Sequence, residues 1–248
     1  MPDPSRSVVL ITGGATGVGA ATAVCFARMN YAVVINYSRS ETEAREVAAH
    51  VRALGAVALV VKADIGDEGE VRAMIARIQS EYGRLDVVVN NAATTRFIDH
   101  ARLDLLTDTV WDDILNTNLK GTFYVCRAAM RLLAASGKGS IVNVTSVAGL
   151  TGGGSSIAYA ASKAAIDSLT RSLARAFAPT VRVNSVAPGP IESRWLADHP
   201  EMIDEAVAVT PLKKASTPDD IAHTIVYLAV GTTMTTGQVL VVDGGRTM

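Results

Sequence analysis

Two side chains that could take part in acid–base catalysis lie four residues apart in the second half of the chain. Tyr159 and Lys163 fall within a pattern that predicts a helix over 158–177, so their spacing places both on one helical face. A free phenol has a pKa of about 10, which is too high for it to serve as a base at neutral pH. A neighbouring ammonium favours the phenolate and lowers that pKa, so we expect Tyr159 to act as a general acid or base.

A glycine-rich segment near the N-terminus could hold a phosphate group. Residues 12–19 read Thr-Gly-Gly-Ala-Thr-Gly-Val-Gly and join a predicted strand at 8–11 to a predicted helix at 18–29. Glycine permits a tight turn and a close approach to a pyrophosphate, which then sits at the positive end of the helix. No lysine follows, as it would in a P-loop nucleoside triphosphatase. The segment therefore predicts dinucleotide binding.

The elements that must position these residues alternate between strand and helix almost throughout. The apolar runs predict seven strands, at 8–11, 33–35, 56–61, 85–89, 140–144, 181–186 and 239–242. Helices are predicted at 18–29, 41–54, 68–82, 111–135 with a break near Gly121, 158–177 and 218–229. Unbroken apolar runs suit strands that are buried on both faces of a parallel sheet. The predicted fold class is α/β, a single doubly wound Rossmann domain over 1–248 with helices on both faces of the sheet.

One long stretch, residues 189–216, shows no clear element. A gap of that length in a compact domain is often a functional lid, so we expect this segment to cover the substrate. Trp195, together with Leu196 and Met202, either lines a substrate pocket or simply packs within the lid.

Composition excludes several classes of function. The net charge of -1 and the lack of a run of like charges argue against a nucleic-acid partner. The longest apolar runs fall well short of the roughly 20 residues that span a bilayer, and the N-terminus lacks an export signal. We therefore expect a cytoplasmic protein without a membrane partner. The four histidines are scattered and lack partners at ligand spacing, so no metal site is expected.

The motifs together resemble the short-chain dehydrogenase/reductase family. Residues 12–19 resemble its T-G-x-x-x-G-x-G, and Tyr159 with Lys163 resembles its Y-x-x-x-K. Further landmarks follow in the family's order, namely Asp64, Asn90-Asn91-Ala92, Pro188-Gly189, Gly237-Gln238 and Asp243-Gly244-Gly245. The resemblance thus extends over nearly the whole chain.

The resemblance implies a catalytic tetrad of Asn118, Ser146, Tyr159 and Lys163. Tyr159 would give a proton to the oxygen of a carbonyl while a nicotinamide cofactor supplies the hydride. Ser146 would hydrogen-bond that oxygen, in an oxyanion-hole role. Lys163 would also hold the nicotinamide ribose, and Asn118 would hold a water in a proton relay.

The resemblance also implies cofactor contacts from the glycine turn to the segment after the sixth predicted strand. Besides Tyr159 and Lys163, these are Gly13, Ala15, Thr16, Gly17, Val18, Tyr37, Ser38, Arg39, Asp64, Ile65, Asn91, Ala92, Pro188, Gly189 and Ile191. Tyr37 stands where NAD-preferring relatives carry an aspartate that would repel a 2′-phosphate. Ser38 and Arg39 offer a hydroxyl and a guanidinium that suit this phosphate, so we expect NADP as the cofactor. The alternative is that Arg39 is a solvated loop residue.

Within the family, the chain resembles the 3-oxoacyl-(acyl-carrier-protein) reductase type. The expected function is NADP(H)-dependent interconversion of a ketone and a secondary alcohol, on a small-molecule substrate that is free or bound to an acyl carrier protein. Two alternatives stay open, an NAD-dependent sugar or steroid alcohol dehydrogenase of the same family and a non-catalytic dinucleotide-binding module. The resemblance further implies a homotetramer or a homodimer, built partly from the helices predicted at 111–135 and 158–177.

Overall fold

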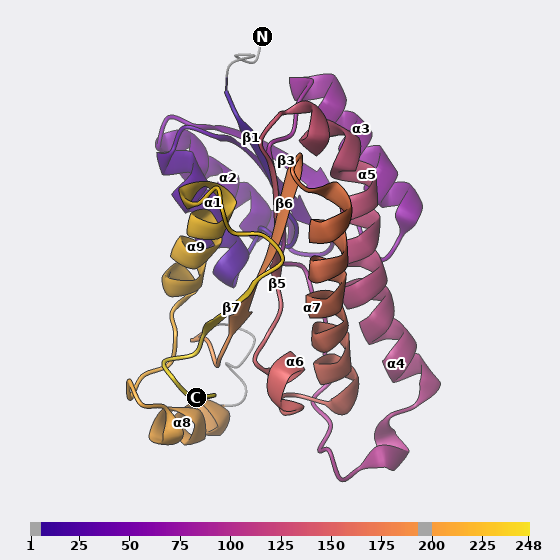
Figure 1. The fold of residues 1–248 in the computed structure, drawn as a ribbon, viewed down its shortest axis with the longest axis vertical. Helices are drawn as coiled ribbons and strands as arrows, with labels where there is room; N and C mark the ends of the chain where they lie inside the picture. The colour runs from indigo at the N-terminus through magenta and orange to yellow at the C-terminus, as the bar shows by residue number, and fades with distance from the viewer. Residues whose placement is uncertain (1–5, 193–199) are drawn as a thin grey trace.

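The computed structural model describes residues 6–192 and 200–248, and its seven strands form one parallel sheet (Figure 1). The strands are β1 (Val8–Ile11), β2 (Ala32–Tyr37), β3 (Val57–Lys62), β4 (Val87–Asn90), β5 (Gly139–Val144), β6 (Val181–Pro188) and β7 (Val239–Val242). Their order across the sheet is β3-β2-β1-β4-β5-β6-β7. The predicted α/β fold with a seven-stranded parallel sheet is confirmed.

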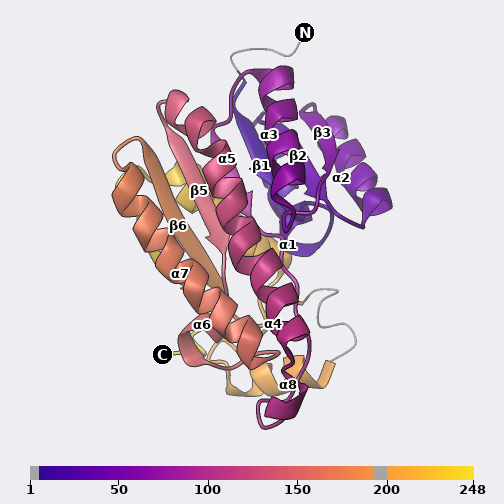
Figure 2. The same ribbon diagram turned by 90° about the vertical axis from the view of Figure 1, so that its right-hand side faces the viewer.

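Helices cover both faces of the sheet. One face carries α1 (Gly17–Arg28), α2 (Glu41–Ala53) and α9 (Pro218–Val226). The other face, seen in Figure 2, carries α3 (Glu68–Tyr82), α5 (Thr122–Ala135) and α7 (Ile157–Phe177). Alternate residues of β1 enter the two cores, Val8 and Leu10 on one side and Val9 and Ile11 on the other. Burial on both faces explains why the strands read as unbroken apolar runs.

The helix predicted at 111–135 is divided into three parts. It consists of α4 (Asp108–Leu115), a π-helical segment (Asn116–Gly121) and α5. A side chain at Gly121 would come within 2.9 Å of the Ile65 backbone oxygen, so only glycine lets the segment pack there. The wider π turn carries Asn118 inward, where it is fully buried. Such local π turns often occur at functional sites.

The predicted lid is not uniformly irregular. It contains the helix α8 (Pro200–Val209), while residues 193–199, including Trp195 and Leu196, lie outside the described residues. A short helix, α6 (Ala148–Thr151), follows β5 and was not predicted, because four residues are too few to show a period. Among the described residues, no helix combines the length and apolar character needed to cross a bilayer.

Candidate active site

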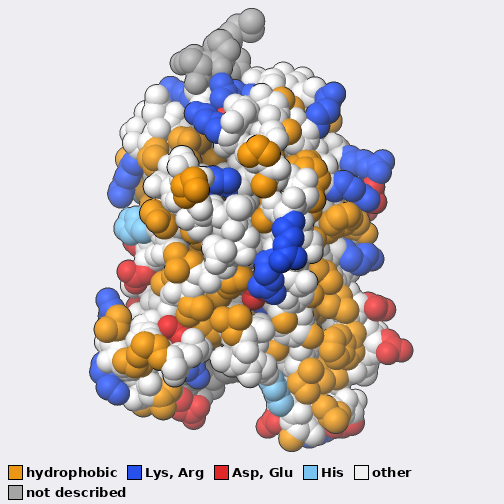
Figure 3. Space-filling view, in the orientation of Figure 1, with side chains coloured by type: hydrophobic (Ala, Val, Ile, Leu, Met, Phe, Trp, Pro, Cys, Tyr) orange, Lys and Arg blue, Asp and Glu red, His pale blue; other side chains and the backbone are white. Residues whose placement is uncertain are grey.

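A groove of about 300 Å³ lies at the carboxyl ends of the strands. Strand β1 pairs with both β2 and β4, so the chain leaves the sheet in opposite directions at this point, where ligands bind in open α/β sheets. This end of the molecule also carries α6 and α8, and the surface is notched between them (Figure 3). The groove is lined by Gly13, Ala15, Thr16, Asn36, Tyr37, Ser38, Arg39, Ser40, Ala63, Asp64, Ile65, Ala92, Ala93, Thr94 and Thr117.

The glycine turn forms one wall of this groove with its bare backbone. Gly13 and Gly17 have φ angles of +58° and +52°, which side chains rarely tolerate. A Cβ on Gly13 would lie 2.9 Å from the Cα of Ala92. A Cβ on Gly19 would overlap the Gly13 carbonyl oxygen and lie 2.7 Å from Nδ2 of Asn91. Glycine at these positions therefore lets the turn pack closely against the segment after β4.

The N-terminus of α1 faces the groove without a side-chain cap. Thr16 is its N-cap residue and makes no capping hydrogen bond, whereas Asp67, Ser156 and Thr217 cap α3, α7 and α9 with their side chains. The first turn of α1 also lacks an acidic residue. The first amides of a helix have no partner within it and carry partial positive charge, so this end is suited to an anion.

Thr12 and Asn91 fasten the glycine turn to the segment after β4. The Thr12 hydroxyl accepts hydrogen bonds from the backbone amides of Asn91 and Ala92, at 3.0 and 3.1 Å. The Asn91 side chain donates to the carbonyl oxygens of Thr12 and Gly13, at 3.1 and 3.0 Å. Asn91 thus holds the glycine turn in place, and with it the backbone that is predicted to bind the cofactor.

The far corner of the groove carries the residues expected to select the cofactor. Ser38 and Arg39 are exposed there, and Arg39 has no ion-pair partner among the described residues. Tyr37 hydrogen-bonds to Glu41, and this bond together with desolvation raises the pKa of the phenol. Glu41 pairs with Arg45, whose guanidinium lies 2.6 Å away and holds the pKa of that carboxyl below its usual range. The Glu41 carboxylate beside this corner is therefore already paired with its own arginine, while Asp64 lines the same groove.

Asn36 was not predicted as a site residue, although it is buried at the end of β2 and lines the groove. Its Nδ2 donates to the Ala63 carbonyl oxygen at 2.9 Å, and its Oδ1 accepts from the Gly13 amide at 3.3 Å. It therefore links β2, β3 and the glycine turn. The sequence did carry a signal for Asn36, because it is a polar residue that directly follows the apolar run of a buried strand. Thr94 and Thr117 were also missed, because no motif marks them.

Ser146, Tyr159 and Lys163 come together beside the end of β5. The Lys163 Nζ lies 5.5 Å from the centroid of the Tyr159 ring and donates to the Val144 carbonyl oxygen at 2.9 Å. The Tyr159 side chain hydrogen-bonds to that of Ser146. Lys163 is only 3% exposed. The spacing along α7 and the turn after β5 thus place an ammonium, a phenol and a hydroxyl in one group.

Burial dominates the proton affinities of this group. Desolvation raises the pKa of Tyr159 to about 12, although the Ser146 hydroxyl opposes this shift. Desolvation lowers the pKa of Lys163 to about 8. Burial thus opposes the lowering of the phenol pKa that we expect from Lys163 beside a bound dinucleotide, and that lowering stays a prediction.

Asn118 uses its side chain to hold the segment after β4. Its Oδ1 accepts from the Thr94 amide at 2.8 Å, and its Nδ2 donates to the Thr94 oxygen and to the Ser162 hydroxyl, both at 3.0 Å. Ser162 in turn donates to the Tyr159 carbonyl oxygen at 2.7 Å. Asn118 therefore ties α7 to the groove, and a water bound by this residue stays a prediction.

Three predicted contacts lie at or just after the end of β6 and not on the groove wall described above. The carbonyl oxygen of Pro188 accepts from Val147 at 2.9 Å, and the Gly189 amide donates to Val242 at 2.9 Å. Ile191 forms an isolated bridge with Ser216. Their positions beside α6 are compatible with a nicotinamide ring there, which stays a prediction.

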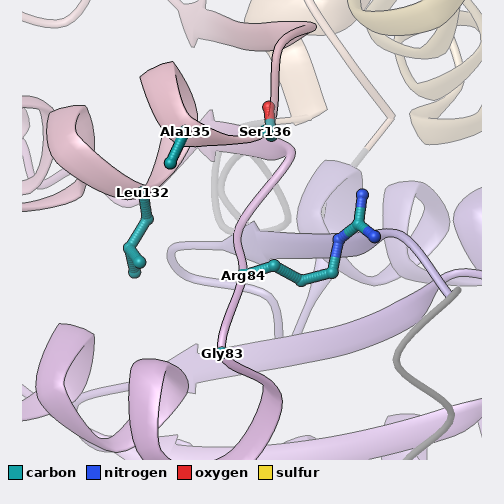
Figure 4. Close-up of a pocket in the computed structure, with 5 residues that line it drawn as sticks. All are labelled: Gly83, Arg84, Leu132, Ala135 and Ser136. Carbon is teal, nitrogen blue, oxygen red and sulfur yellow. The ribbon is translucent and has the colours of Figure 1, made fainter.

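A second hollow, of about 200 Å³, lies away from the glycine-lined groove. It is lined by Gly83, Arg84, Leu132, Ala135 and Ser136 (Figure 4), at the end of the sheet where β4 begins. The Arg84 guanidinium is engaged by the buried Asp86, at 2.6 Å. Within the described part of the chain, no three His, Cys, Asp or Glu side chains gather to hold a metal ion.

Comparison with known proteins gives matches over almost the full length. A family model described as enoyl-(acyl carrier protein) reductase matches residues 13–247. A protein named as ketoacyl reductase 2 of the granaticin polyketide synthase, from Streptomyces violaceoruber, is 44% identical over 98% of this chain and 96% of its own. The 3-oxoacyl-[acyl-carrier-protein] reductase of Staphylococcus aureus is 36% identical over 96% of this chain and 97% of its own. A crystal structure of a short-chain dehydrogenase/reductase from Burkholderia xenovorans superposes with a TM-score of 0.93, at 38% identity and 98% coverage of both chains.

Proposed function

The chain belongs to the short-chain dehydrogenase/reductase family, and from this premise we propose that it is an NADP(H)-dependent reductase of 3-oxoacyl compounds. The observation that carries the proposal is the group formed by Ser146, Tyr159 and Lys163 at the same sheet edge as the glycine-lined groove. A phenol, a hydroxyl and an ammonium suit reduction of a carbonyl, because that reaction needs a proton at the oxygen that gains charge.

The groove fits a dinucleotide. Its wall is bare glycine backbone, and the uncapped N-terminus of α1 offers amides to a pyrophosphate. Asp64 and Ile65 line the same groove and would contact the adenine end. When bound, the reduced nicotinamide supplies the hydride, which is chemistry that no side chain of this chain provides.

The side chains would then bind and protonate the carbonyl oxygen of the substrate. Ser146 hydrogen-bonds the carbonyl oxygen and orients it toward Tyr159. The Tyr159 hydroxyl, protonated because its pKa is high, gives its proton to that oxygen as negative charge develops there. The Lys163 ammonium stabilises the phenolate left behind and would reach the nicotinamide ribose. In the reverse direction, the positive charge of an oxidised nicotinamide would add to that of Lys163 and favour the phenolate.

Several features support NADP over NAD. Arg39 extends beside the groove without an ion-pair partner among the described residues, and Ser38 adds a hydroxyl next to it. Arg45 engages the Glu41 carboxylate, which therefore opposes a 2′-phosphate less than a free carboxylate would. An NAD-dependent sugar or steroid alcohol dehydrogenase would gain nothing from a cation at this place.

The substrate class follows from the relatives. The relatives named above are reductases of ketoacyl or 3-oxoacyl groups, and one of these names includes the acyl carrier protein. We therefore expect a 3-oxoacyl thioester, carried by a small thiol or by an acyl carrier protein. A non-catalytic dinucleotide-binding module would have no use for a buried lysine beside a tyrosine and a serine.

The test is oxidation of NADPH followed by absorbance, with 3-oxoacyl thioesters of a small thiol and of an acyl carrier protein, and with sugars and steroids as controls. Turnover of the thioesters, and its loss in Tyr159→Phe, is the expected result. Tight NADPH binding without turnover on any substrate would instead indicate the module. Preferential turnover of a sugar or steroid with NADH would indicate the alcohol dehydrogenase.

We also propose assembly into a homotetramer or a homodimer through α5 and α7. Phe123 is 37% exposed on α5, and the Arg127 guanidinium lies 5.1 Å from the centroid of its ring. Light scattering during gel filtration measures the mass directly. A mass of one chain, 25.9 kDa, would contradict the proposal.

A further inference from the structure

A buried carboxylate lies one helical turn beyond the active-site lysine. Asp167 follows Lys163 by four residues on α7, so the two side chains project from the same face of the helix with Cβ atoms about 5–6 Å apart. Asp167 is 2% exposed and Lys163 is 3% exposed. An acidic residue is rarely buried to this extent without a partner of opposite charge.

The neutral groups beside the Asp167 carboxyl are two hydroxyls that favour its ionised form but have their well-formed hydrogen bonds elsewhere. Both carboxylate oxygens are sealed from solvent, and neither has a well-formed hydrogen bond among the described residues. The nearby Thr145 hydroxyl donates to the Val186 oxygen at 3.1 Å, and the Ser185 hydroxyl is shared with Thr170 at 2.7 Å. These hydroxyls lie beside the carboxyl while their best hydrogen bonds go elsewhere.

The polar layer around Asp167 extends across three strands. The Asn90 side chain on β4 donates to Asn143 on β5, which donates to Thr170 on α7, both at 2.8 Å. Thr170 then meets Ser185 on β6. The residues of this row are therefore held in place by hydrogen bonds to one another.

Among the described residues, the charged groups that act on this pair all come from α7. Desolvation raises the pKa of Asp167, while Arg171 and Lys163, beside the Thr145 hydroxyl, favour its ionised form. The carboxylate of Asp167 in turn is the one charge that supports the Lys163 ammonium against its own desolvation. Strands β5 and β6 contribute Thr145 and Ser185, which are neutral, and the neighbouring titratable group toward the substrate is Tyr159.

We propose that Asp167 is a positioning residue of the active site, whose buried carboxylate is the countercharge that holds Lys163 in its ammonium form. The two residues contact adjacent positions at the end of β5, since Lys163 donates to the Val144 oxygen and Asp167 lies beside the Thr145 hydroxyl. Asp167 thereby acts on the reaction through Lys163 without touching the substrate. This inference rests on the proposed reductase function for its kinetic consequences, but the electrostatic coupling of the two residues can be measured without turnover.

The direct test follows the ¹³Cε resonance of Lys163 against pH in the NADPH-bound protein, assigned by its loss in Lys163→Arg. In Asp167→Asn we expect the Lys163 titration to move to lower pH by about one pH unit or more, since removing a nearby opposite charge disfavours the charged form. The pH at which reductase kcat/KM begins to fall should move in the same direction. Asp167→Glu retains the charge, so both the Lys163 titration and the fall of kcat/KM should stay close to their pH values in the unmodified protein.

A matched control is Asp86→Asn, which neutralises another buried carboxylate, at the start of β4 and paired with Arg84. It should cost stability and leave the Lys163 titration unchanged. If Asp86→Asn shifts this titration as much as Asp167→Asn does, the effect is structural and the proposal is overturned.

A measurement on the unmodified protein covers the case in which Asp167→Asn does not fold. The ¹³Cγ resonance of Asp167 reports its ionisation, and we expect a carboxylate at neutral pH whose shift responds when Lys163 titrates. A carboxyl that stays protonated throughout would overturn the proposal. If the Lys163 shift appears but no 3-oxoacyl substrate is reduced, the proposed function fails while the electrostatic coupling stands.

Discussion

The ammonium nitrogen of Lys163 lies 5.5 Å from the centre of the Tyr159 ring; Lys163 is buried and Tyr159 is partly buried. Desolvation moves their two pKa values in opposite ways, upward for the phenol and downward for the ammonium. At neutral pH both groups therefore hold their protons, which is the state required for reducing a carbonyl.

Replacing Tyr159 by Phe removes the proton donor and little else. General acid catalysis of this kind contributes about 10²–10⁴-fold, so we expect kcat to fall by that factor. NADPH affinity, measured by the fluorescence of the bound nicotinamide, should change less than about threefold, since the ring is retained. A variant that keeps more than a tenth of its kcat would show that another group supplies the proton.

The rate of reduction should depend on the charge of Lys163. Its pKa falls from 10.5 to about 8, so the ammonium is present below about pH 8 and is lost above it. We expect log(kcat/KM) for reduction to be level near neutrality and to decline above about pH 8 as the phenolate loses its countercharge. A profile that stays flat to about pH 10 would contradict this role.

The same shift predicts how stability varies with pH. Between about pH 8 and 10.5, the unfolded chain binds a proton on Lys163 that the folded chain has released. The contribution of this group to the free energy of unfolding therefore rises with pH across that window. Denaturant unfolding of the protein and of Lys163→Met should show the difference. Identical pH slopes in the two proteins would mean that the lysine titrates normally in the fold.

Arg39 should decide between the two cofactors. A hydrogen bond to a charged group contributes about 1.5–3 kcal/mol, so Arg39→Ala should weaken NADPH binding by roughly 10- to 150-fold and leave NADH binding almost unchanged. Arg72→Ala is the matched control, because Arg72 is exposed on α3, pairs with Glu68 and does not line the groove. Isothermal calorimetry with both nucleotides measures all four constants. Equal losses for NADPH and NADH in Arg39→Ala would refute a phosphate contact.

Gly19 should not tolerate even a methyl group. Its Cβ would overlap the Gly13 oxygen and press on the Asn91 side chain that fastens the turn. We expect Gly19→Ala to lower the free energy of unfolding by about 1–3 kcal/mol and to abolish measurable NADPH binding. Gly153→Ala is the control, because its Cβ would meet its nearest neighbour, the Thr151 hydroxyl, at an ordinary 3.5 Å. Thermal melts and cofactor titration of both variants test this, and a fully active Gly19→Ala would show that the turn can shift.

Local chemistry by itself determined the alternation of elements and the identity of the glycine turn. Strand β1 was predicted with its exact bounds, because a strand buried on both faces must be apolar throughout. Tyr159 and Lys163 were paired correctly, because a helix brings positions i and i+4 together whatever surrounds it.

Only the tertiary structure decided how these residues behave. Burial is a property of the packed chain, so the high pKa of Tyr159 and the low pKa of Lys163 could not be read from their spacing. The π turn that carries Asn118 inward depends on Gly121 packing against Ile65, residues 56 positions apart. Asn36 gained its role in the same way, because its hydrogen-bond partner Ala63 follows another strand. The role of Asp167 depends on its burial in the polar layer beneath the site. Spacing along a chain fixes which residues share an element, while desolvation and contacts between elements exist only once the sheet and helices have packed.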